Sequence, residues 1–246
     1  MSDPVLNLSG YAFVALARLA ERREALHRQA AACGLMGTVL LAEEGINLVV
    51  AGPEHGAREW LAFVRQDRLW AALDAKESWS DAMPFKHLRV KVKREIIRMN
   101  QPQVQPAAGR APAVDAATLA SWLAAGHDDA GRELLLLDTR NGFEVDAGAF
   151  DGATDWRLRK FSDFPAALAA HRGELDGRTV VTYCTGGIRC EKAALALQAA
   201  GVRNVHQLDG GVLRYFEKLP AAPHWHGRCF VFDARETLGP DLAPAA

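Results

Sequence analysis

The residues best suited to chemistry in this chain lie in one short loop that follows an apolar run. The loop reads Cys184-Thr185-Gly186-Gly187-Ile188-Arg189. Its two glycines allow a tight curl of inward-pointing backbone N–H groups, an anion-binding nest that a helix starting near Cys190 would strengthen. A thiolate of Cys184 is stabilised there, also by Arg189, so its pKa is expected to fall. The loop predicts a reactive thiol, in a cradle that would also suit a persulfide or a bound oxyanion.

Loop length separates two kinds of cysteine chemistry. A cysteine-dependent phosphatase needs the spacing C-x5-R, which makes a loop wide enough to surround a phosphate group. Here Arg189 lies five positions after Cys184, which gives C-x4-R. The smaller loop fits a sulfur atom better than a phosphate group, and this argues against a phosphatase.

The remaining cysteines have less definite roles. Cys190 could resolve an oxidised or persulfidated Cys184 through a disulfide, or it could be a small packing residue, and neither interpretation is favoured. Cys33 is predicted to pack, and Cys229 to lie in a strand or tail. The four cysteines include no C-x-x-C pair, and we find no flavin motif, haem motif or convincing set of metal ligands. We therefore predict neither a metal nor a cofactor.

Strands alternating with helices must position the Cys184 loop. Three apolar runs predict strands: Leu134–Leu137, Thr179–Tyr183 and Val205–Leu208. Helical stretches lie at Thr118–Ala125, Asp163–His171, Glu191–Ala200 and Val212–Lys218. The alternation predicts a parallel sheet covered by helices on both faces, with its site beyond the carboxyl ends of the strands. Asp138 and Arg140 follow the first strand at that edge, and we expect them to brace it rather than take part in chemistry.

Residues 1–99 predict a different fold. The predicted elements follow the order β-α-β-β-α-β, which indicates a ferredoxin-like, acylphosphatase-like α+β sandwich. They are Tyr11–Leu16, Ala17–Ala32, Met36–Leu41, Ile46–Val50, Glu54–Leu73 and Leu88–Met99. A hairpin turn at Ala42–Gly45 joins the two middle strands. This fold by itself implies no activity.

Composition bounds the class of protein. The 246 residues are 49% hydrophobic and 24% charged, as in ordinary globular domains. Residues 100–113 are rich in proline and glutamine and predict a linker, so we expect domains at 1–99 and 114–225 and a tail at 226–246. The net charge of −1 gives no general attraction to nucleic acid or membrane. No apolar run is long enough for a membrane span, and no signal peptide is recognisable, which points to the cytoplasm.

One local cluster departs from this neutral balance. Its cations are Lys86, Arg89, Lys91, Lys93, Arg94 and Arg98, opposed only by Glu95. Arg89, Lys91 and Lys93 fall on one face of the predicted strand. The cluster could contact RNA phosphates, or it could be a solvated sheet face or an edge that blocks aggregation. Composition alone favours the second interpretation.

The decapeptide Cys184–Ala193 closely resembles the tRNA uridine hydroxylase family of rhodanese-domain proteins. The strand end Asp138-Thr139-Arg140 and the turn Leu208-Asp209-Gly210-Gly211 are similar to rhodanese domains in general. The segments Glu44–Asn47 (EGIN) and Gly227–Asp233 (GRCFVFD) support the narrower match. The resemblance covers roughly residues 10–235. Longer relatives extend beyond GRCFVFD into a cysteine-containing tail that this chain lacks.

The resemblance implies a tRNA-modifying oxidoreductase. Members of that family convert the wobble uridine, position 34 of certain tRNAs, to 5-hydroxyuridine with molecular oxygen. The cysteine that matches Cys184 is their active-site residue, drawn as a persulfide carrier. The resemblance also implies tRNA as a partner, held at its anticodon arm with help from the N-terminal domain, and an unidentified electron donor. With the resemblance, RNA contact by the basic cluster is as well supported as a role as a solvated sheet face or a protected sheet edge.

Two other functions share the motifs of the second domain. A sulfurtransferase would move sulfur from thiosulfate or a persulfide donor to a thiol acceptor through the same cysteine. A rhodanese fold that only binds a partner is the third possibility, and the intact Cys184 loop counts against it. The N-terminal domain and the Cys190-Glu191-Lys192-Ala193 extension favour the hydroxylase, because a generic sulfurtransferase requires neither.

Overall fold

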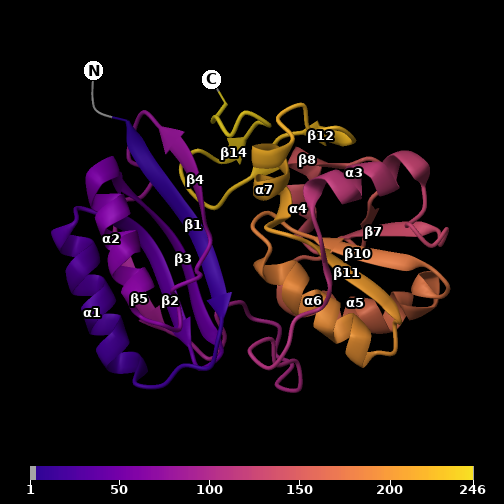
Figure 1. The fold of residues 1–246 in the computed structure, drawn as a ribbon, viewed down its shortest axis with the longest axis horizontal. Helices are drawn as coiled ribbons and strands as arrows, with labels where there is room; N and C mark the ends of the chain where they lie inside the picture. Colours follow the sequence, from indigo (N-terminus) through magenta and orange to yellow (C-terminus); the bar gives the residue numbers. More distant parts are fainter. Residues whose placement is uncertain (1–3, 246) are drawn as a thin grey trace. The chain divides into compact units, whose positions relative to one another are not determined.

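A computed structural model describes residues 4–245, which form two compact units (Figure 1). The first unit comprises the chain up to Ile97 together with Phe232–Glu236, and the second comprises Arg98–Val231 and Thr237–Ala245. The domain limits expected from composition stay a prediction. Among residues 4–245, no helix is both long and apolar enough to cross a membrane.

The first unit is a five-stranded sheet with two helices on one face (Figure 1). Its elements are β1 (Val5–Phe13), α1 (Leu19–Ala32), β2 (Met36–Ala42), β3 (Gly45–Pro53), α2 (Glu54–Gln66), β4 (Ala75–Ser80) and β5 (Leu88–Val92). The strand order is β4-β1-β3-β2-β5, in which the first four strands pair antiparallel and β5 runs parallel to β2. This arrangement confirms the predicted ferredoxin-like, acylphosphatase-like class.

Three predicted elements of this unit were wrong in extent. The strand predicted at Tyr11–Leu16 is β1, which begins at Val5 and ends at Phe13. The fourth strand of the β-α-β-β-α-β order is β4, whose sequence AKESWS has no apolar run and gave no strand signal. The predicted strand Leu88–Met99 is instead the short strand β5, added at the sheet edge, so Lys93 lies just beyond it. Helix α2 also stops early, because Asp67 accepts a hydrogen bond from the Leu69 N–H (3.0 Å) and begins a turn.

The core of the first unit lies between the sheet and its helices. Leu6, Leu48 and Val39 from three neighbouring strands are buried there against Leu26 of α1 and Trp60 of α2. The alternation of the strands leaves their other side chains on the helix-free face. Burial of the apolar side chains against the helices therefore decides which side chains lie on the helix-free face of this sheet.

The β2–β3 turn, which lies at the predicted hairpin Ala42–Gly45, needs a glycine. Gly45 has a φ of +150°, and a Cβ atom there would lie 2.0 Å from the Ala12 carbonyl oxygen. The residues around it hold a distant segment. Glu44 accepts a hydrogen bond from the Ile96 N–H (2.8 Å), and the Asn47 side chain donates one to the Ile96 carbonyl (3.2 Å). The EGIN segment thus anchors the chain that follows β5.

The second unit is a five-stranded parallel sheet with strand order β6-β11-β10-β7-β9. Figure 1 shows α5 and α6 on one face and α3 and α7 on the other. Its strands are β6 (Ala113–Val114), β7 (Leu134–Asp138), β9 (Thr154–Asp155), β10 (Thr179–Tyr183) and β11 (Asn204–Leu208). Its helices are α3 (Ala116–Ala125), α4 (Gly142–Ala147), α5 (Phe164–His171), α6 (Ile188–Ala199) and α7 (Gly211–Lys218). The predicted parallel sheet with helices on both faces is confirmed.

Short elements of this unit escaped the sequence analysis. They are β6, β9, helix α4 and the strand β8 (Gly148–Phe150), which pairs with β12 (Trp225–Gly227). A further pair joins β13 (Cys229–Phe230) to β14 (Thr237–Leu238). Elements of two to six residues carry too little periodicity to be recognised. One of them, α4, contributes to the site.

Candidate active site

Cys184 lies directly after the central strand β10, at the carboxyl end of the parallel sheet. Every residue of β10 is buried, and Cys184 itself is 0% exposed. The chain then curls through Gly187, whose φ of +101° suits glycine, and enters α6 at Ile188. The Gly187 N–H donates to the Cys184 sulfur at 3.2 Å. The sulfur thus lies in a backbone cradle at the start of a helix, as the glycine spacing predicts.

The start of α7, which follows the neighbouring strand β11, supports this loop. The Val212 N–H donates to the Cys184 carbonyl (3.0 Å), and the Leu213 N–H donates to the Thr185 carbonyl (3.1 Å). Gly211 lies so close that a Cβ atom would be 2.4 Å from the Cys184 carbonyl oxygen. Only glycine permits this approach, because φ there is +68° as well. The double-glycine turn is therefore a part of the site.

The surroundings of Cys184 favour its thiolate. Burial raises the pKa of this thiol, but hydrogen bonding by Cys190, the charge of Arg189 and the backbone N–H groups of both residues outweigh burial and lower it to about 5. Most Cys184 side chains are then thiolates at neutral pH. A thiolate is the nucleophilic form of cysteine and the form that accepts a sulfane sulfur from a donor to become a persulfide.

Cys190 lies beside Cys184 on the first turn of α6. The two sulfur atoms are 3.9 Å apart, and the Cys190 sulfur is also 2.9 Å from the Gly187 carbonyl oxygen. Burial and the neighbouring Cys184 raise the pKa of Cys190 well above its ordinary value, so it stays a thiol. Its single S–H has two acceptors within reach, the Gly187 carbonyl oxygen and the Cys184 sulfur, and donation to the Cys184 thiolate is one of the effects that lower the pKa of Cys184. A disulfide would require the sulfurs to approach to about 2 Å, and the resolving role stays a prediction.

Arg189 is held by a carboxylate that the sequence analysis missed. Its guanidinium forms two parallel hydrogen bonds with Glu144 of α4, at 2.6 and 2.7 Å, and Glu144 is 0% exposed. The N–H of Asn141, which precedes α4, also donates to Glu144 (3.0 Å). The spacing Asn141-x-x-Glu144 is that of a helix capping box and could have revealed α4. The ion pair fixes the cation beside the Cys184 loop.

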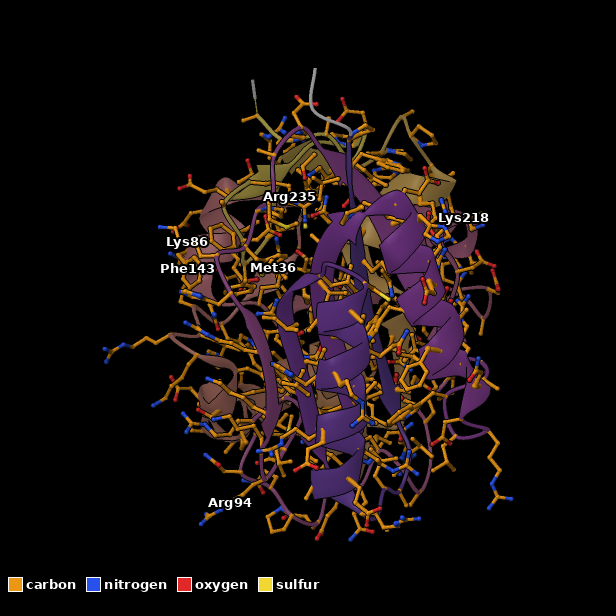
Figure 2. The ribbon with its side chains drawn as sticks, turned by 90° about the vertical axis from the view of Figure 1, so that its left-hand side faces the viewer. Met36, Lys86, Arg94, Phe143, Lys218 and Arg235 are labelled. Carbon is orange, nitrogen blue, oxygen red and sulfur yellow. The ribbon has the colours of Figure 1, made fainter. Side chains whose placement is uncertain are left out.

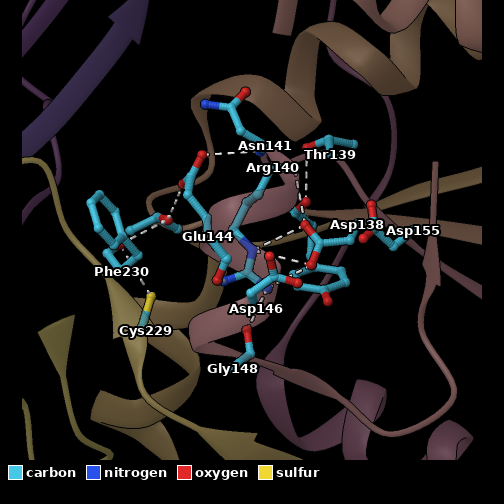
Figure 3. A network of polar contacts seen from close by, with 12 residues as sticks. Asp138, Thr139, Arg140, Asn141, Glu144, Asp146, Gly148, Asp155, Cys229 and Phe230 are labelled. Atoms are coloured by element: carbon cyan, nitrogen blue, oxygen red, sulfur yellow. Dashed lines mark hydrogen bonds and ion pairs between the residues drawn. The ribbon is translucent and has the colours of Figure 1, made fainter. Parts of the chain in front are cut away.

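Asp138 and Arg140 form a second buried ion pair at the end of β7 (Figure 3). The Arg140 guanidinium donates to Asp138 at 2.6 Å and to the Gly148 carbonyl at 2.8 Å. It also lies 5.4 Å from the Tyr183 ring and 5.2 Å from the Trp225 ring. The pair thus links β7, β8 and the residue before Cys184, which is the geometry of a brace.

The other two cysteines lack the features of a reactive thiol. Cys229 is 0% exposed and lies near Glu144 and Phe230 (Figure 3), and burial raises its pKa to about 12. Burial also raises the pKa of Cys33, which is packed in the first unit. Of the four cysteines, Cys184 alone has a lowered pKa. The structure therefore singles out the same cysteine that the loop predicts.

Comparison with known proteins covers nearly the whole chain. Residues 5–96 match the family model described as "UPF0176 acylphosphatase like domain", and residues 119–218 match the "Rhodanese-like domain". A protein of Variovorax paradoxus named tRNA uridine(34) hydroxylase is 58% identical, over 98% of this chain and 92% of its own length. A protein of Bordetella petrii with the same name is 56% identical, over 98% and 95%. This chain belongs to the tRNA uridine(34) hydroxylase family.

Membership in the tRNA uridine(34) hydroxylase family confirms the resemblance drawn from the Cys184–Ala193 decapeptide. It also weighs against the sulfurtransferase alternative, because the named hydroxylases match both units and not the rhodanese-like unit alone. In this hydroxylase-family chain, the cations from Lys86 to Arg94, for which RNA contact was considered, belong to the first unit. Cys184 belongs to the second.

Removing the charge of Arg189 is expected to raise the pKa of Cys184 in this hydroxylase-family protein. In the unaltered protein the lowered pKa means that the thiolate should form at a lower pH than that of an ordinary cysteine, and should be lost as the pH falls through this pKa. Arg189→Ala should shift this midpoint upward, whereas Arg189→Lys keeps the charge and should shift it less. The measurement is the ultraviolet absorbance of the thiolate against pH, taken as the difference from Cys184→Ser. An unchanged midpoint in Arg189→Ala would contradict the electrostatic role.

Proposed function

We propose that this protein hydroxylates uridine 34 of tRNA to 5-hydroxyuridine, in the cytoplasm, with molecular oxygen as co-substrate and Cys184 as the essential residue. The relatives' shared name, at 55–58% identity over at least 98% of this chain, supports the tRNA reaction. The double match to both domain families supports a reaction that uses both units. Uridine 34 lies in the anticodon, so the anticodon arm is the part of tRNA that must reach the site.

The observation that carries the role of Cys184 is its lowered pKa in a backbone cradle at the carboxyl end of a parallel sheet. A thiolate held in this way can act directly or can carry a persulfide sulfur. The cradle of N–H groups and the Arg189–Glu144 pair would stabilise negative charge on either sulfur species. We therefore assign the reacting group to the sulfur of Cys184.

The balance of the proposed reaction requires a further partner. One oxygen atom of O₂ enters the bond between carbon 5 and its hydrogen, and the other atom is reduced to water. This reduction consumes two electrons and two protons. An electron donor must therefore act together with this protein, and it is a partner distinct from tRNA.

The test is a gain of function in a bacterial strain that makes no 5-hydroxyuridine in its tRNA. The full chain is expressed there, and nucleosides from purified tRNA are measured by mass spectrometry. The appearance of 5-hydroxyuridine or its derivatives at position 34 supports the proposal. Expression of folded protein without any such nucleoside contradicts it, and the sulfur content of the same tRNA pool and of low-molecular-weight thiols would then be measured instead.

A further inference from the structure

The first unit carries a concentration of unpaired positive charge, which we call the basic strip: Lys86, Arg89, Lys91, Lys93 and Arg94. All five side chains are exposed. Within residues 4–245, no ion pair joins any of them to a carboxylate. Figure 2 labels the two ends of the strip, Lys86 and Arg94, along one rim of this unit.

Some other surface arginines of the protein are paired with acids. Arg58 pairs with Glu54 (2.8 Å) and Glu77 (3.1 Å) in the same unit, and Arg157 pairs with Asp146 (2.6 Å) in the other. The net charge of the chain is −1, so cations and acids balance overall. The basic strip is therefore a local excess of charge and not a consequence of a basic composition.

The strand β5 presents part of the strip on the helix-free face of its sheet. Leu88 and Val90 pack against the core beneath the helices. Arg89 and Lys91 alternate with them and point to the opposite face. On β2, Thr38 lies opposite Arg89 and Leu40 lies opposite Lys91. Two residues apart on a strand, their Cα atoms are separated by about 7 Å. The cations thus form a regular row.

The backbone that carries the strip is fixed at both ends. Before β5, the His87 carbonyl accepts a hydrogen bond from the Gly37 N–H of β2 (2.9 Å). The Lys93 N–H donates to the Leu41 carbonyl of β2 (2.7 Å), directly after β5 ends. Three residues on, Glu44 and Asn47 hold the N–H and the carbonyl of Ile96. The backbone that bears the positive charges is therefore preorganised, and a ligand that binds them does not have to order a flexible loop.

Protection of a sheet edge explains only part of this arrangement. β5 is the outermost strand, and charged side chains on an edge strand discourage pairing with another chain. That argument covers Arg89 and Lys91. It does not cover Lys86 and Arg94, which lie outside the strand and outside its pairing with β2.

We propose that the basic strip binds the phosphate backbone of tRNA; this rests on the proposed function, which supplies tRNA as the substrate. Arginine and lysine contact phosphates by charge-assisted hydrogen bonds, and such contacts dominate nucleic-acid affinity without reading sequence. Cys184 on the other unit performs the chemistry, and the strip contributes affinity.

The experiment compares two charge-matched triple variants of the full chain. Arg89→Gln/Lys91→Gln/Lys93→Gln removes three charges from the basic strip. Arg23→Gln/Arg28→Gln/Arg68→Gln removes three exposed charges from the helix-covered side of the same unit. The dissociation constant for unmodified tRNA is measured over a range of salt concentrations, without a reductant, so that no turnover occurs. Thermal unfolding checks that both variants are folded.

The strip variant should bind tRNA on the order of tenfold more weakly. The logarithm of its association constant should also depend less steeply on the logarithm of the salt concentration, with the slope smaller in magnitude by roughly two, because three phosphate contacts are lost. The control variant should bind as the unaltered protein does. If the strip variant does not fold, Lys86→Gln/Arg94→Gln, outside the strand, replaces it, with a correspondingly smaller loss expected.

Equal weakening by both triple variants, or no weakening by the strip variant, would overturn the proposal. Failure of the unaltered chain to bind tRNA would overturn it as well. The proposed function is judged separately by the nucleoside measurement. If the protein forms 5-hydroxyuridine but binds tRNA independently of the basic strip, the proposed function stands and the proposed binding surface is wrong. If it binds tRNA through the basic strip but forms no 5-hydroxyuridine, the binding surface stands and the proposed function is wrong.

Discussion

Replacing Cys184 with serine is expected to lower the rate of 5-hydroxyuridine formation on the order of a thousandfold or more. Serine is close to cysteine in size, so the buried cradle should survive the change. The hydroxyl group, however, forms no anion at neutral pH and carries no persulfide, and both possible forms of the reactive sulfur are lost. The measurement is the initial rate on isolated tRNA, supplied with oxygen and a reductant, by nucleoside mass spectrometry.

The matched control for this result is Cys33→Ser. Cys33 is a buried cysteine of the first unit whose pKa is raised and not lowered, so its replacement should leave the rate unchanged within a few-fold. Cys190→Ser divides the two interpretations of that residue. A packing residue should tolerate the change with a near-normal rate, whereas a resolving thiol should not. Full activity of Cys184→Ser would remove Cys184 from the mechanism.

Replacing Glu144 with alanine is expected to destabilise the protein by about 3–5 kcal/mol, because it leaves the guanidinium of Arg189 buried without its partner. The two side chains are 0% and 7% exposed, and solvent cannot compensate for the lost carboxylate. The Cys184 loop should then move, since Arg189 is part of it, and hydroxylation should fall with stability. Urea unfolding followed by circular dichroism measures the change in free energy.

Asp146→Ala is the matched control for Glu144→Ala, because it lies on the same short helix α4. Asp146 also pairs with an arginine, Arg157, but both side chains are about 60% exposed, so solvent screens the pair and its loss should change stability little. A second variant, Glu144→Leu/Arg189→Leu, replaces the buried pair by apolar groups and should regain part of the stability without the charge that activates Cys184. Equal losses from Glu144→Ala and Asp146→Ala would show that the buried pair is unimportant.

The sequence by itself determined the elements whose signal is local. β10 is predicted to the residue, because five consecutive β-branched or aromatic residues are typical of a strand buried on both faces. The Cys184 loop follows from two glycines and an arginine at fixed spacing, and its conformation is set by backbone geometry that glycine alone adopts freely. The lowered pKa of Cys184 was expected for the same reason.

Only the tertiary structure decided the features that join distant segments. Glu144 reaches Arg189 across 45 positions of sequence, and no local pattern names the partner of a buried charge. β4 is a strand because β1 pairs with it, although its own residues are mostly polar. β5 ends at Val92, and not at Met99, because the EGIN segment captures the chain at Ile96. Pairing and burial of this kind depend on what lies opposite in space, which the order of residues alone does not specify.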